Sequence, residues 1–487
     1  MGRLVVVSNR VSVPGDSTKR AGGLEVALRP LLQSKKGVWL GWSGKVTPAD
    51  HIETRCIRHK NVDHVVTDLS QEDFEEYYKG FANRVLWPFL HYRPDLAEYA
   101  GRDLRGYFRV NAHFATKLDA IVADDDLIWV HDYHLIPIAD AMRRRGCKNR
   151  MGFFLHVPFP PPEILTSLPG HERLLPLLAK YDVVGFQTEG DAQNFVRYLA
   201  SECPQLRQLH SVERTGCAVV AGKDGQQTLI GSFPASIEPR AFARLARRNA
   251  QSSLVKKLVA SLGGRTLVIG VDRPDYTKGL VQRFDAFELF LKGQTESEGS
   301  VTYLQIVPRN RSEIPEYSEH EEALRSAAGR INGQYGEVSW TPIRYVNRVY
   351  GRSALAGLYR TARVGLVTPL RDGMNLVAKE YVAAQDPENP GVLILSRFAG
   401  AAVGFKRALL VNPSDAESVA GSLAQALAMP LAERRERHAA LFANLCDYDI
   451  DRWHREFLAA LQGDRDLKES SSPVALDDGE WTQSSAA

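Results

Sequence analysis

The chain has 487 residues, a formal net charge of +3, 44% hydrophobic residues and 24% charged residues. This is the composition of an ordinary globular protein, and the length excludes a small disulfide-stapled scaffold and predicts roughly two to four domains. A net charge so near zero argues against broad electrostatic capture of nucleic acid or of an acidic membrane, so an anionic ligand must be met by local groups.

Cysteine usage and the absence of long apolar windows bear on the compartment. The 5 cysteines include no close pair, so neither a disulfide framework nor a C-x-x-C metal site is predicted. No signal-peptide pattern opens the sequence, and no window approaches the roughly 18 apolar residues of a membrane helix. We therefore expect a protein of the reducing cytoplasm without membrane or nucleic-acid partners. No heptad seam marks an interface, so a homo-oligomer is left open.

Short apolar runs rich in Val, Ile and Leu alternate with amphipathic stretches long enough to form helices. Continuous apolar runs are typical of strands that are covered on both faces, so we predict parallel α/β sheets. In the first half the runs lie at 3–8, 127–131, 151–156, 182–186 and 228–234, and in the second half at 266–271, 301–307, 363–367, 391–396 and 407–411.

A polar stretch around residues 235–262 separates these two series. Two successive βα series predict two doubly wound, Rossmann-like domains with a boundary near residue 240. The segment 464–487 is rich in charge, Ser and Asp and has little to bury, which predicts a disordered tail.

Ligands of such sheets bind beyond the carboxyl ends of the strands, so polar residues that follow an apolar run are the first candidates for a site. The first run ends near Arg10, and Gly22 and Gly23 stand before a helical pattern. Glycines at a helix entrance let a phosphate approach the backbone, and Arg10 offers a forked phosphate contact. A plain turn is the competing interpretation. The absence of a G-x-G-x-x-G fingerprint argues against a nicotinamide oxidoreductase.

Two further runs of the first half end in histidine, and an aspartate follows the first of them. Asp132 and His134 follow His131, and His156 closes the run at 151–156. Carboxylate and imidazole groups there can bind sugar hydroxyls or move protons. A metal site is disfavoured because no further Cys/His cluster joins the histidines. The acidic run 124–126 precedes its strand, so we expect a solvated turn rather than a cation site.

Cations follow two runs of the second half. Arg273 and Lys278 come after 266–271, and we expect no acid to neutralise either cation, a pattern that suits a diphosphate leaving group. Arg309 and Arg311 come after 301–307 and offer a second anion site. Each arginine taken singly could form a surface ion pair, but several cations at strand ends favour an anionic ligand.

The segment 366–380 runs from an apolar strand through a polar turn into a helical pattern. Asp372 can accept hydrogen bonds from sugar hydroxyls, the amides near Gly373 can approach a sugar or phosphate, and Glu380 can clamp a ribose diol. By spacing alone Glu380 could instead be an exposed carboxylate on a helix. No G-x-S-x-G elbow supports serine-hydrolase chemistry.

Eight motifs that occur in one order along residues 3–460 closely resemble those of the trehalose-6-phosphate synthase family. Ordered motifs over most of a chain are far more specific than any single match. They are VVVSNR at 5–10, AGGL at 21–24, VLWPFLHYR at 85–93, IWVHDYHL at 128–135, FFLHVPFPPPEI at 153–164, GFQTE at 185–189, AGRINGQYG at 328–336 and PLRDGMNLVAKEYVA at 369–383.

The resemblance implies the glycosyltransferase B fold, with two Rossmann-like domains facing a cleft. Residues 1–240 would form the acceptor domain and 241–449 the donor domain, and a helix at 450–463 would return to the first. It also implies transfer of glucose from a nucleotide sugar, by default UDP-glucose, to glucose 6-phosphate. The product would be trehalose 6-phosphate, formed with retention and with no metal or other cofactor.

Carried over by position, the resemblance also implies roles for individual residues. The acceptor set is Arg10, Tyr78, Trp87, Asp132 and Arg311. The residues near the reacting centre are Arg273, Lys278, His156, Asp132 and Asp372. The donor set is Gly22, Gly23, Arg273, Lys278, Tyr350, Asp372, Gly373, Met374, Asn375, Leu376, Val377, Ala378, Lys379 and Glu380.

Three positions depart from the family pattern, namely Pro274, Ser236 and Gly404, and they bear on donor preference and domain closure. Donors that carry guanine or adenine therefore stay open. Two rival functions also stay open. One is a coupling enzyme of the same fold that uses a cyclitol-type donor, and the other is an inactive regulatory protein that binds sugar phosphates.

Overall fold

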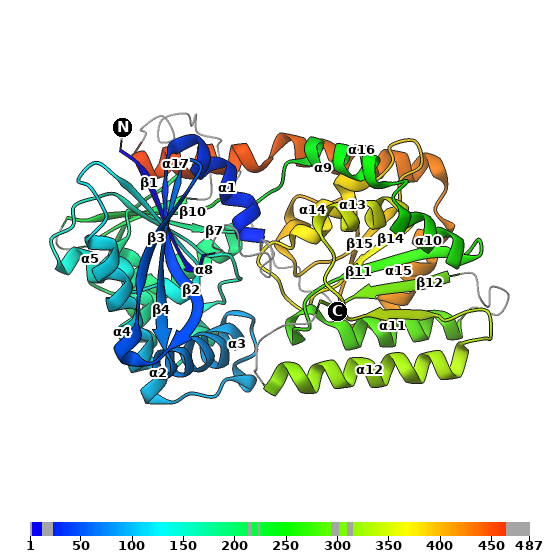
Figure 1. The fold of residues 1–487 in the computed structure, drawn as a ribbon, viewed down its shortest axis with the longest axis horizontal. Helices are drawn as coiled ribbons and strands as arrows, with labels where there is room; N and C mark the ends of the chain where they lie inside the picture. The colour runs from blue at the N-terminus through cyan, green and yellow to red at the C-terminus, as the bar shows by residue number, and fades with distance from the viewer. Residues whose placement is uncertain are drawn as a thin grey trace, which may run out of the picture.

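The computed structural model describes residues 2–11, 23–212, 217–222, 225–293, 301–308 and 315–463. Gly22, Arg309, Arg311 and the segment 464–487 therefore lie outside the described residues. The chain forms two lobes that lie side by side (Figure 1), each built around one sheet. We call them the first lobe, which holds the N-terminal sheet, and the second lobe.

The sheet of the first lobe has the strand order β3-β4-β2-β1-β5-β6-β7-β10-β9-β8. The strands from β4 to β10 in this order run parallel, whereas β3, β9 and β8 are antiparallel to their neighbours. Their bounds are β1 (Leu4–Arg10), β2 (Val38–Thr47), β3 (Thr54–His59), β4 (Val62–Ser70), β5 (Leu127–His131), β6 (Met151–Phe154), β7 (Val183–Phe186), β8 (Arg207–Val212), β9 (Cys217–Ala221) and β10 (Gln227–Ser232).

The sheet of the second lobe is parallel throughout and has the order β13-β12-β11-β14-β15-β16. Its strands are β11 (Thr266–Val271), β12 (Val301–Ile306), β13 (Ile343–Val346), β14 (Val364–Val367), β15 (Val392–Ser396) and β16 (Leu409–Val411). The fold class predicted from the apolar runs, two doubly wound α/β units, is therefore confirmed.

Helices cover both faces of each sheet. In the first lobe they are α1 (Gly23–Lys35), α2 (Gln71–Asp73), a π-helix (Phe74–Leu86), α3 (Trp87–Leu90), α4 (Gly101–Asp119), α5 (Ile138–Arg144), α6 (Pro162–Leu165), α7 (His171–Leu174) and α8 (Glu189–Glu202). The later helices of the chain are α9 (Pro239–Asn249), α10 (Ser253–Leu262), α11 (Leu280–Lys292), α12 (Pro315–Tyr335), α13 (Arg352–Thr361), α14 (Leu376–Ala384), α15 (Ala416–Ala428), α16 (Leu431–Asp447) and α17 (Ile450–Gln462). Among the described residues, none of these helices combines the length and apolar character that a membrane span requires.

Alternate residues of the central strands enter opposite cores. In β1, Val5 and Val7 join the core that contains α4, α5 and α8, whereas Leu4 and Val6 join the core that contains α1 and α17. All ten apolar runs of the sequence are strands, with ends shifted by at most two residues. Burial on both faces explains why these strands are apolar throughout.

The prediction of a purely parallel first sheet is wrong at its edges. The strands β2, β3, β4, β8, β9 and β13 were not predicted, and the antiparallel strands among them lie at the two margins of the sheet. Edge strands are covered on fewer sides and can carry polar residues, as in the sequence TRCIRH of β3. Continuous apolar runs therefore find the centre of such a sheet and miss its margins.

The chain crosses between the lobes at two places. It passes from β10, which ends at Ser232, to α9, which begins at Pro239 and packs on α13 and α14 of the second lobe. At the other end α17 returns across the top of Figure 1 and lies over the first lobe. Phe457 stacks on Trp129 with ring centroids 4.4 Å apart. A Cβ on Gly185 would lie 2.8 Å from the Phe457 ring, so this glycine lets α17 approach the sheet.

Candidate active site

A cavity of about 290 Å³ lies between the lobes, where the carboxyl ends of β6 and β11 face one another. We call it the His156 cavity. Charged groups from the second lobe and an imidazole from the first share its wall, so it is suited to a polar, anionic ligand. Its lining residues are His156, Gln187, Ala235, Val271, Asp272, Arg273, Lys278, Asp372, Met374, Asn375, Leu376 and Val377.

A second cavity of about 280 Å³ meets the first along the beginning of α14. We call it the Glu380 cavity. Leu376 and Val377 line both cavities, so an extended ligand could occupy the two together. Its lining residues are Ala27, Ser236, Ile237, Glu238, Tyr350, Arg352, Leu355, Leu376, Val377, Glu380 and Ile450.

Lys278 and Asp372 form an ion pair at the wall of the His156 cavity. The Lys278 Nζ lies 2.6 Å from Oδ2 of Asp372, and Asn375 Nδ2 donates to the same oxygen at 3.0 Å. Burial acts to raise the pKa of Asp372, but Lys278 and Asn375 hold it below its ordinary value. The expectation that no acid neutralises this cation is therefore wrong, because a carboxylate 94 residues away in the sequence reaches it.

Arg273 reaches from the end of β11 toward the first lobe. Its guanidinium lies 5.6 Å from the centre of the Trp87 ring, a cation–π contact between the lobes, and 4.0 Å from Asp275. Its side chain is 60% exposed, so it keeps enough freedom to meet an incoming anion. Trp87 therefore contacts Arg273, in addition to the contact with the acceptor sugar that the resemblance implies for it.

The residue Asn375 caps the beginning of α14 at the wall of the His156 cavity. Asn375 takes a left-handed backbone conformation, with φ of 73°, and caps the helix by accepting from the Ala378 amide at 3.1 Å. The first residues of the helix, Leu376 and Val377, line both cavities, so α14 begins where the cavities meet. Free helix amides and the helix dipole favour a phosphate there.

Glu380 and Lys379 follow on α14 with different surroundings. Burial raises the pKa of Glu380 to about 7, although Arg352, 3.5 Å away, opposes the shift. The amine of Lys379 turns away from both cavities and donates to the Ala235 carbonyl at 2.7 Å, while burial lowers its pKa to about 7. Lys379 thus joins α14 to the connection between the lobes, and neither it nor Ala378 is among the residues that line the His156 cavity or the Glu380 cavity.

Gly373 occupies a contact between the lobes and lines neither cavity. A Cβ at Gly373 would lie 2.1 Å from the carbonyl oxygen of His156. The next residues, Met374 and Asn375, do line the His156 cavity. Gly373 itself therefore packs against the first lobe, and the approach of the adjacent amides to a sugar or phosphate stays a prediction.

Side chains of the acceptor set gather at the end of β1. The Arg10 guanidinium lies 5.5 Å from the centre of the Trp42 ring, and the Tyr78 ring lies 5.5 Å from the same tryptophan. Trp42 lies on β2, a strand that the apolar runs did not predict, and it pairs in register with Arg10 of β1. Trp42 is therefore a site residue that the apolar runs do not predict. Gly23 begins α1 nearby in the chain.

Asp132 stands directly after β5 in a strained backbone conformation, with φ of 78°. Its carboxylate accepts from the His156 amide at 3.3 Å. Burial raises the pKa of Asp132 to about 6, although hydrogen bonds from the Tyr133 and His156 amides and the charge of Arg273 oppose the shift. Strain of this kind is often retained where a side chain must point at a ligand.

The solvated turn expected for residues 124–126 is wrong for Asp126. Asp126 is 2% exposed, and its carboxylate accepts from the Arg3 side chain at 2.7 Å and from the Ala123 amide at 2.9 Å. It therefore holds the start of β1 in place. The described residues contain no group of three or more His, Cys, Asp or Glu side chains placed to hold a metal ion.

A stacked contact between the lobes was also missed. The Arg371 guanidinium lies 3.6 Å from the centre of the Tyr92 ring and 5.2 Å from that of Phe398. Tyr92 has a positive φ of 63°, and it belongs to the first lobe. The contact fixes the loop that carries Asp372 against the first lobe. No sequence periodicity signals it, because the two partners lie far apart in the chain.

The three departures from the family pattern have different surroundings. The Ser236 hydroxyl is buried at the wall of the Glu380 cavity and has no hydrogen-bond partner within the described residues. A Cβ on Gly404 would lie 2.9 Å from Asn444 Oδ1, so Asn444 occupies the space of a larger side chain. Pro274 is buried beside Arg273, and nothing in the structure explains its choice.

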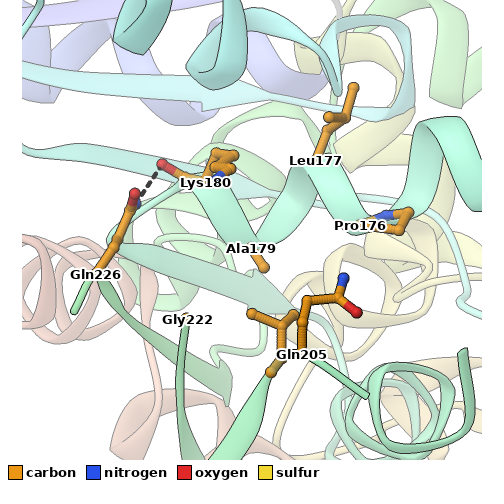
Figure 2. A pocket seen from close by; sticks show the side chains of 8 residues that line it. Pro176, Leu177, Ala179, Lys180, Gln205, Gly222 and Gln226 are labelled. Atoms are coloured by element: carbon orange, nitrogen blue, oxygen red, sulfur yellow. Dashed lines mark hydrogen bonds between the residues drawn. The ribbon is translucent and has the colours of Figure 1, made fainter. Parts of the chain in front are cut away.

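A further cavity of about 320 Å³ lies away from these groups, at the antiparallel edge of the first sheet. Pro176 and Leu177 line one side of it and Gln205 and Gly222 the other (Figure 2). Gln226 closes one end by donating to the Lys180 carbonyl at 2.7 Å. None of the predicted site residues lines this cavity.

Similarity to known proteins agrees with the geometry. A curated trehalose-6-phosphate synthase from Sinorhizobium fredii is 50% identical over 472 residues, 96% of this chain and 99% of the relative. A crystal structure of a UDP-forming alpha,alpha-trehalose-phosphate synthase from Burkholderia xenovorans, in complex with glucose-6-phosphate, is 44% identical with a TM-score of 0.91 and covers 95% of this chain and 100% of its own. A structure from E. coli bound with UDP-2-fluoro glucose is 43% identical with a TM-score of 0.87 and covers 96% and 100%.

The model of glycosyltransferase family 20 matches residues 3–463, nearly the whole of the chain that the structure describes. This match agrees with the two doubly wound lobes, the cavities between them and the ordered motifs of the sequence. The chain therefore belongs to glycosyltransferase family 20.

Proposed function

We propose that this protein is a trehalose-6-phosphate synthase. It transfers glucose from a nucleotide sugar, UDP-glucose, to glucose 6-phosphate with retention at the donor carbon, and releases trehalose 6-phosphate and a nucleoside diphosphate. The observation that carries the proposal is the His156 cavity, where Lys278, Arg273 and the amides of α14 converge. The similarity to a UDP-forming enzyme crystallised with glucose-6-phosphate supports the choice of both substrates.

The donor nucleotide sugar spans the two joined cavities. Its diphosphate lies near Lys278, Arg273 and the start of α14, where both cations stabilise the departing negative charge. Its nucleoside extends into the Glu380 cavity, where Glu380 accepts from the ribose and Tyr350 and Leu376 line the wall. Its sugar lies toward the group formed by His156 and Asp372. The remaining members of the donor set assigned by resemblance are Gly22, Gly23, Gly373, Met374, Asn375, Val377, Ala378 and Lys379.

The acceptor lies on the first lobe. Arg10 binds its phosphate together with Arg311, which the resemblance adds to the set. Tyr78 and Trp87 contact the sugar, and Asp132 accepts from one of its hydroxyls. With donor and acceptor held on facing lobes, the acceptor hydroxyl attacks the face from which the diphosphate departs.

The proton of the attacking hydroxyl passes to an oxygen of the departing phosphate. His156 is an unsuitable base, because burial lowers its pKa to about 3 and so disfavours its protonated form. Cationic side chains and helix amides supply the electrostatic stabilisation of the transition state. Same-face attack of this kind yields retention.

In this proposal residues 1–240 form the domain that binds the acceptor, and residues 241–449 form the domain that binds the donor. The helix at 450–463 ties the donor domain back to the acceptor domain. A cytoplasmic location is part of the proposal because the cysteine pattern favours a reducing compartment.

The proposed function is tested with purified protein, glucose 6-phosphate and separate UDP-, GDP- and ADP-glucose donors. We expect release of UDP together with a non-reducing disaccharide phosphate, identified by NMR as the α,α-linked product. Faster release with GDP- or ADP-glucose would correct the donor. Turnover only with a cyclitol-type donor would favour the coupling enzyme, and no release with any donor would favour the regulatory protein.

The acid limb of the pH profile should report Asp132. Burial raises its pKa from 3.8 to about 6, so the carboxylate that accepts a sugar hydroxyl is lost as the pH falls below about 6. We expect the protonation of Asp132 to contribute a fall in kcat/KM for glucose 6-phosphate of about tenfold for each pH unit below that value. Stability depends on pH in the opposite direction from activity. Because the pKa of Asp132 is raised in the folded state, the free energy of unfolding falls as the pH rises from 3.8 to about 6.

Asp132→Asn is the control, because the phosphate of the acceptor also titrates near pH 6. We expect this variant to be less active and to lose one of the two ionisations from the limb. An unchanged limb in Asp132→Asn would assign it to the substrate alone and would contradict the prediction.

A further inference from the structure

Two buried imidazoles stand at the ends of neighbouring strands behind the His156 cavity. His131 ends β5 and has no exposed surface, and His156 lies two residues beyond the end of β6. Nδ1 of His131 lies 3.0 Å from Nε2 of His156, which makes one hydrogen bond between the rings. In the proposed reaction His156 lies beside the donor sugar, whereas His131 contacts neither substrate.

Both rings are neutral at physiological pH. Burial lowers the pKa of His156 to about 3 and holds the pKa of His131 well below its ordinary value. Each neutral ring carries one N–H, and the single hydrogen bond between them needs one donor and one acceptor. Either His131 donates from Nδ1, or His156 donates from Nε2.

The second nitrogen of His131 decides between these arrangements. Its Nε2 is buried and has no hydrogen-bond partner within the described residues. If His156 donated, His131 would need its proton on Nε2, and a buried N–H would be left without an acceptor. Orphaned buried N–H groups are rarer and costlier than an unused acceptor. His131 therefore carries its proton on Nδ1.

The proton on His131 in turn fixes the tautomer of His156. Because Nε2 of His156 accepts from His131, its own proton must lie on Nδ1. The backbone of His156 is held as well, since its amide donates to Asp132 and its carbonyl accepts from Gln187 at 3.4 Å. Phe154 packs edge-on against the ring with centroids 4.7 Å apart. Nδ1 is thus the ring nitrogen left for the cavity that His156 lines.

We propose that His131 is a positioning residue that makes His156 a permanent hydrogen-bond donor to a hydroxyl of the donor sugar. The inference rests on the proposed function only for the identity of that hydroxyl. The other tautomer of His156 would present the lone pair of Nδ1 to the cavity. The donor sugar would then lose one hydrogen bond that holds its hydroxyl group while the ring develops positive charge. His131 touches no substrate and acts through His156 alone.

The tautomer is measured directly in the substrate-free protein. With histidine labelled by ¹⁵N, long-range ¹H–¹⁵N spectra separate protonated from bare ring nitrogens, and His156→Asn and His131→Asn assign the two rings. We expect the proton on Nδ1 in both. A proton on Nε2 of His156 would overturn the proposal. Because this measurement needs no substrate, its outcome is independent of whether the protein proves to be a transferase.

Kinetics of two variants separate positioning from packing. His131→Asn keeps an N–H donor at the place of Nδ1, whereas His131→Leu keeps the apolar volume and removes the donor. We expect His131→Leu to lower kcat by about 10- to 100-fold, the loss of one hydrogen bond in the transition state, with an unchanged KM for glucose 6-phosphate. His131→Asn should retain kcat within about threefold.

Equal activities of the two variants would overturn the positioning role, whether both are impaired or both are normal. Thermal unfolding of each variant is recorded beside the kinetics. If His131→Leu does not fold, the comparison of His131→Asn with wild type, and the ¹⁵N spectrum of His156 in that variant, still decide the proposal. A bare Nδ1 on His156 in His131→Asn with normal kcat would contradict it.

Discussion

Lys278→Ala should lower kcat by about 10²- to 10³-fold, the loss observed when one preorganised donor to a developing negative charge is removed. The Nζ of Lys278 lies at the wall of the His156 cavity, 2.6 Å from Oδ2 of Asp372. A cation there faces the diphosphate as its charge grows on departure. Steady-state kinetics with UDP-glucose and glucose 6-phosphate measure the effect.

The same variant should also be less stable, for a separate reason. The side chains of Lys278 and Asp372 are only 12% and 15% exposed, so removal of the amine leaves a largely buried carboxylate that, among the described residues, keeps a side-chain hydrogen bond from Asn375. Breaking such a pair costs on the order of 3 kcal/mol. Burial would then act on the Asp372 carboxyl without the opposing charge, and its pKa should rise.

A double variant separates the two effects. Lys278→Ala with Asp372→Asn removes both charges, so it should recover much of the lost free energy of unfolding and none of the activity. Lys256→Ala, which removes an exposed lysine of the same lobe, is the matched control and should change neither quantity. Recovery of turnover in the double variant would contradict a role for Lys278 in stabilising the leaving group.

The sequence predicts the centre of each sheet because burial on both faces forces continuous apolar runs. It fails at β3 because a strand at the edge of a sheet tolerates polar residues such as Arg55, and it fails at β2 because the apolar start of this inner strand is followed by the polar residues Ser43 and Lys45. Once β2 is missed, Trp42 cannot be placed beside Arg10. The register between β1 and β2 brings these two residues together, and neither residue alone carries that information.

The sequence likewise predicts only some of the residues of the candidate site. Strand ends predict Asp132, Arg273 and Lys278 near a ligand because parallel strands present their carboxyl ends at one edge. Pairings between distant segments have no such signal, as for Lys278 with Asp372. Helical periodicity likewise could not tell that Lys379 points to the Ala235 carbonyl while Glu380 lines a cavity.

Gly373 illustrates the difference between recognising a motif and knowing what it does. The sequence suggests a glycine whose backbone approaches a ligand, and the structure shows one whose missing side chain lets two lobes meet. The distance of 2.1 Å from its Cβ position to the His156 carbonyl is below any real contact, and a backbone atom cannot move aside cheaply. His156, Arg371 with Tyr92, and Arg273 with Trp87 all lie along this junction.

Gly373→Ala should therefore hold the lobes apart and lower kcat by about 10²-fold, since a misplacement of about 1 Å between reacting groups costs that much. The added methyl group need not disturb either core, so the unfolding temperature should stay within a few degrees of wild type, and small-angle X-ray scattering should show a larger radius of gyration. Gly421→Ala is the matched control, because a Cβ there meets nothing within 4 Å. A Gly373→Ala protein with normal kcat would show that the closed contact is dispensable for transfer.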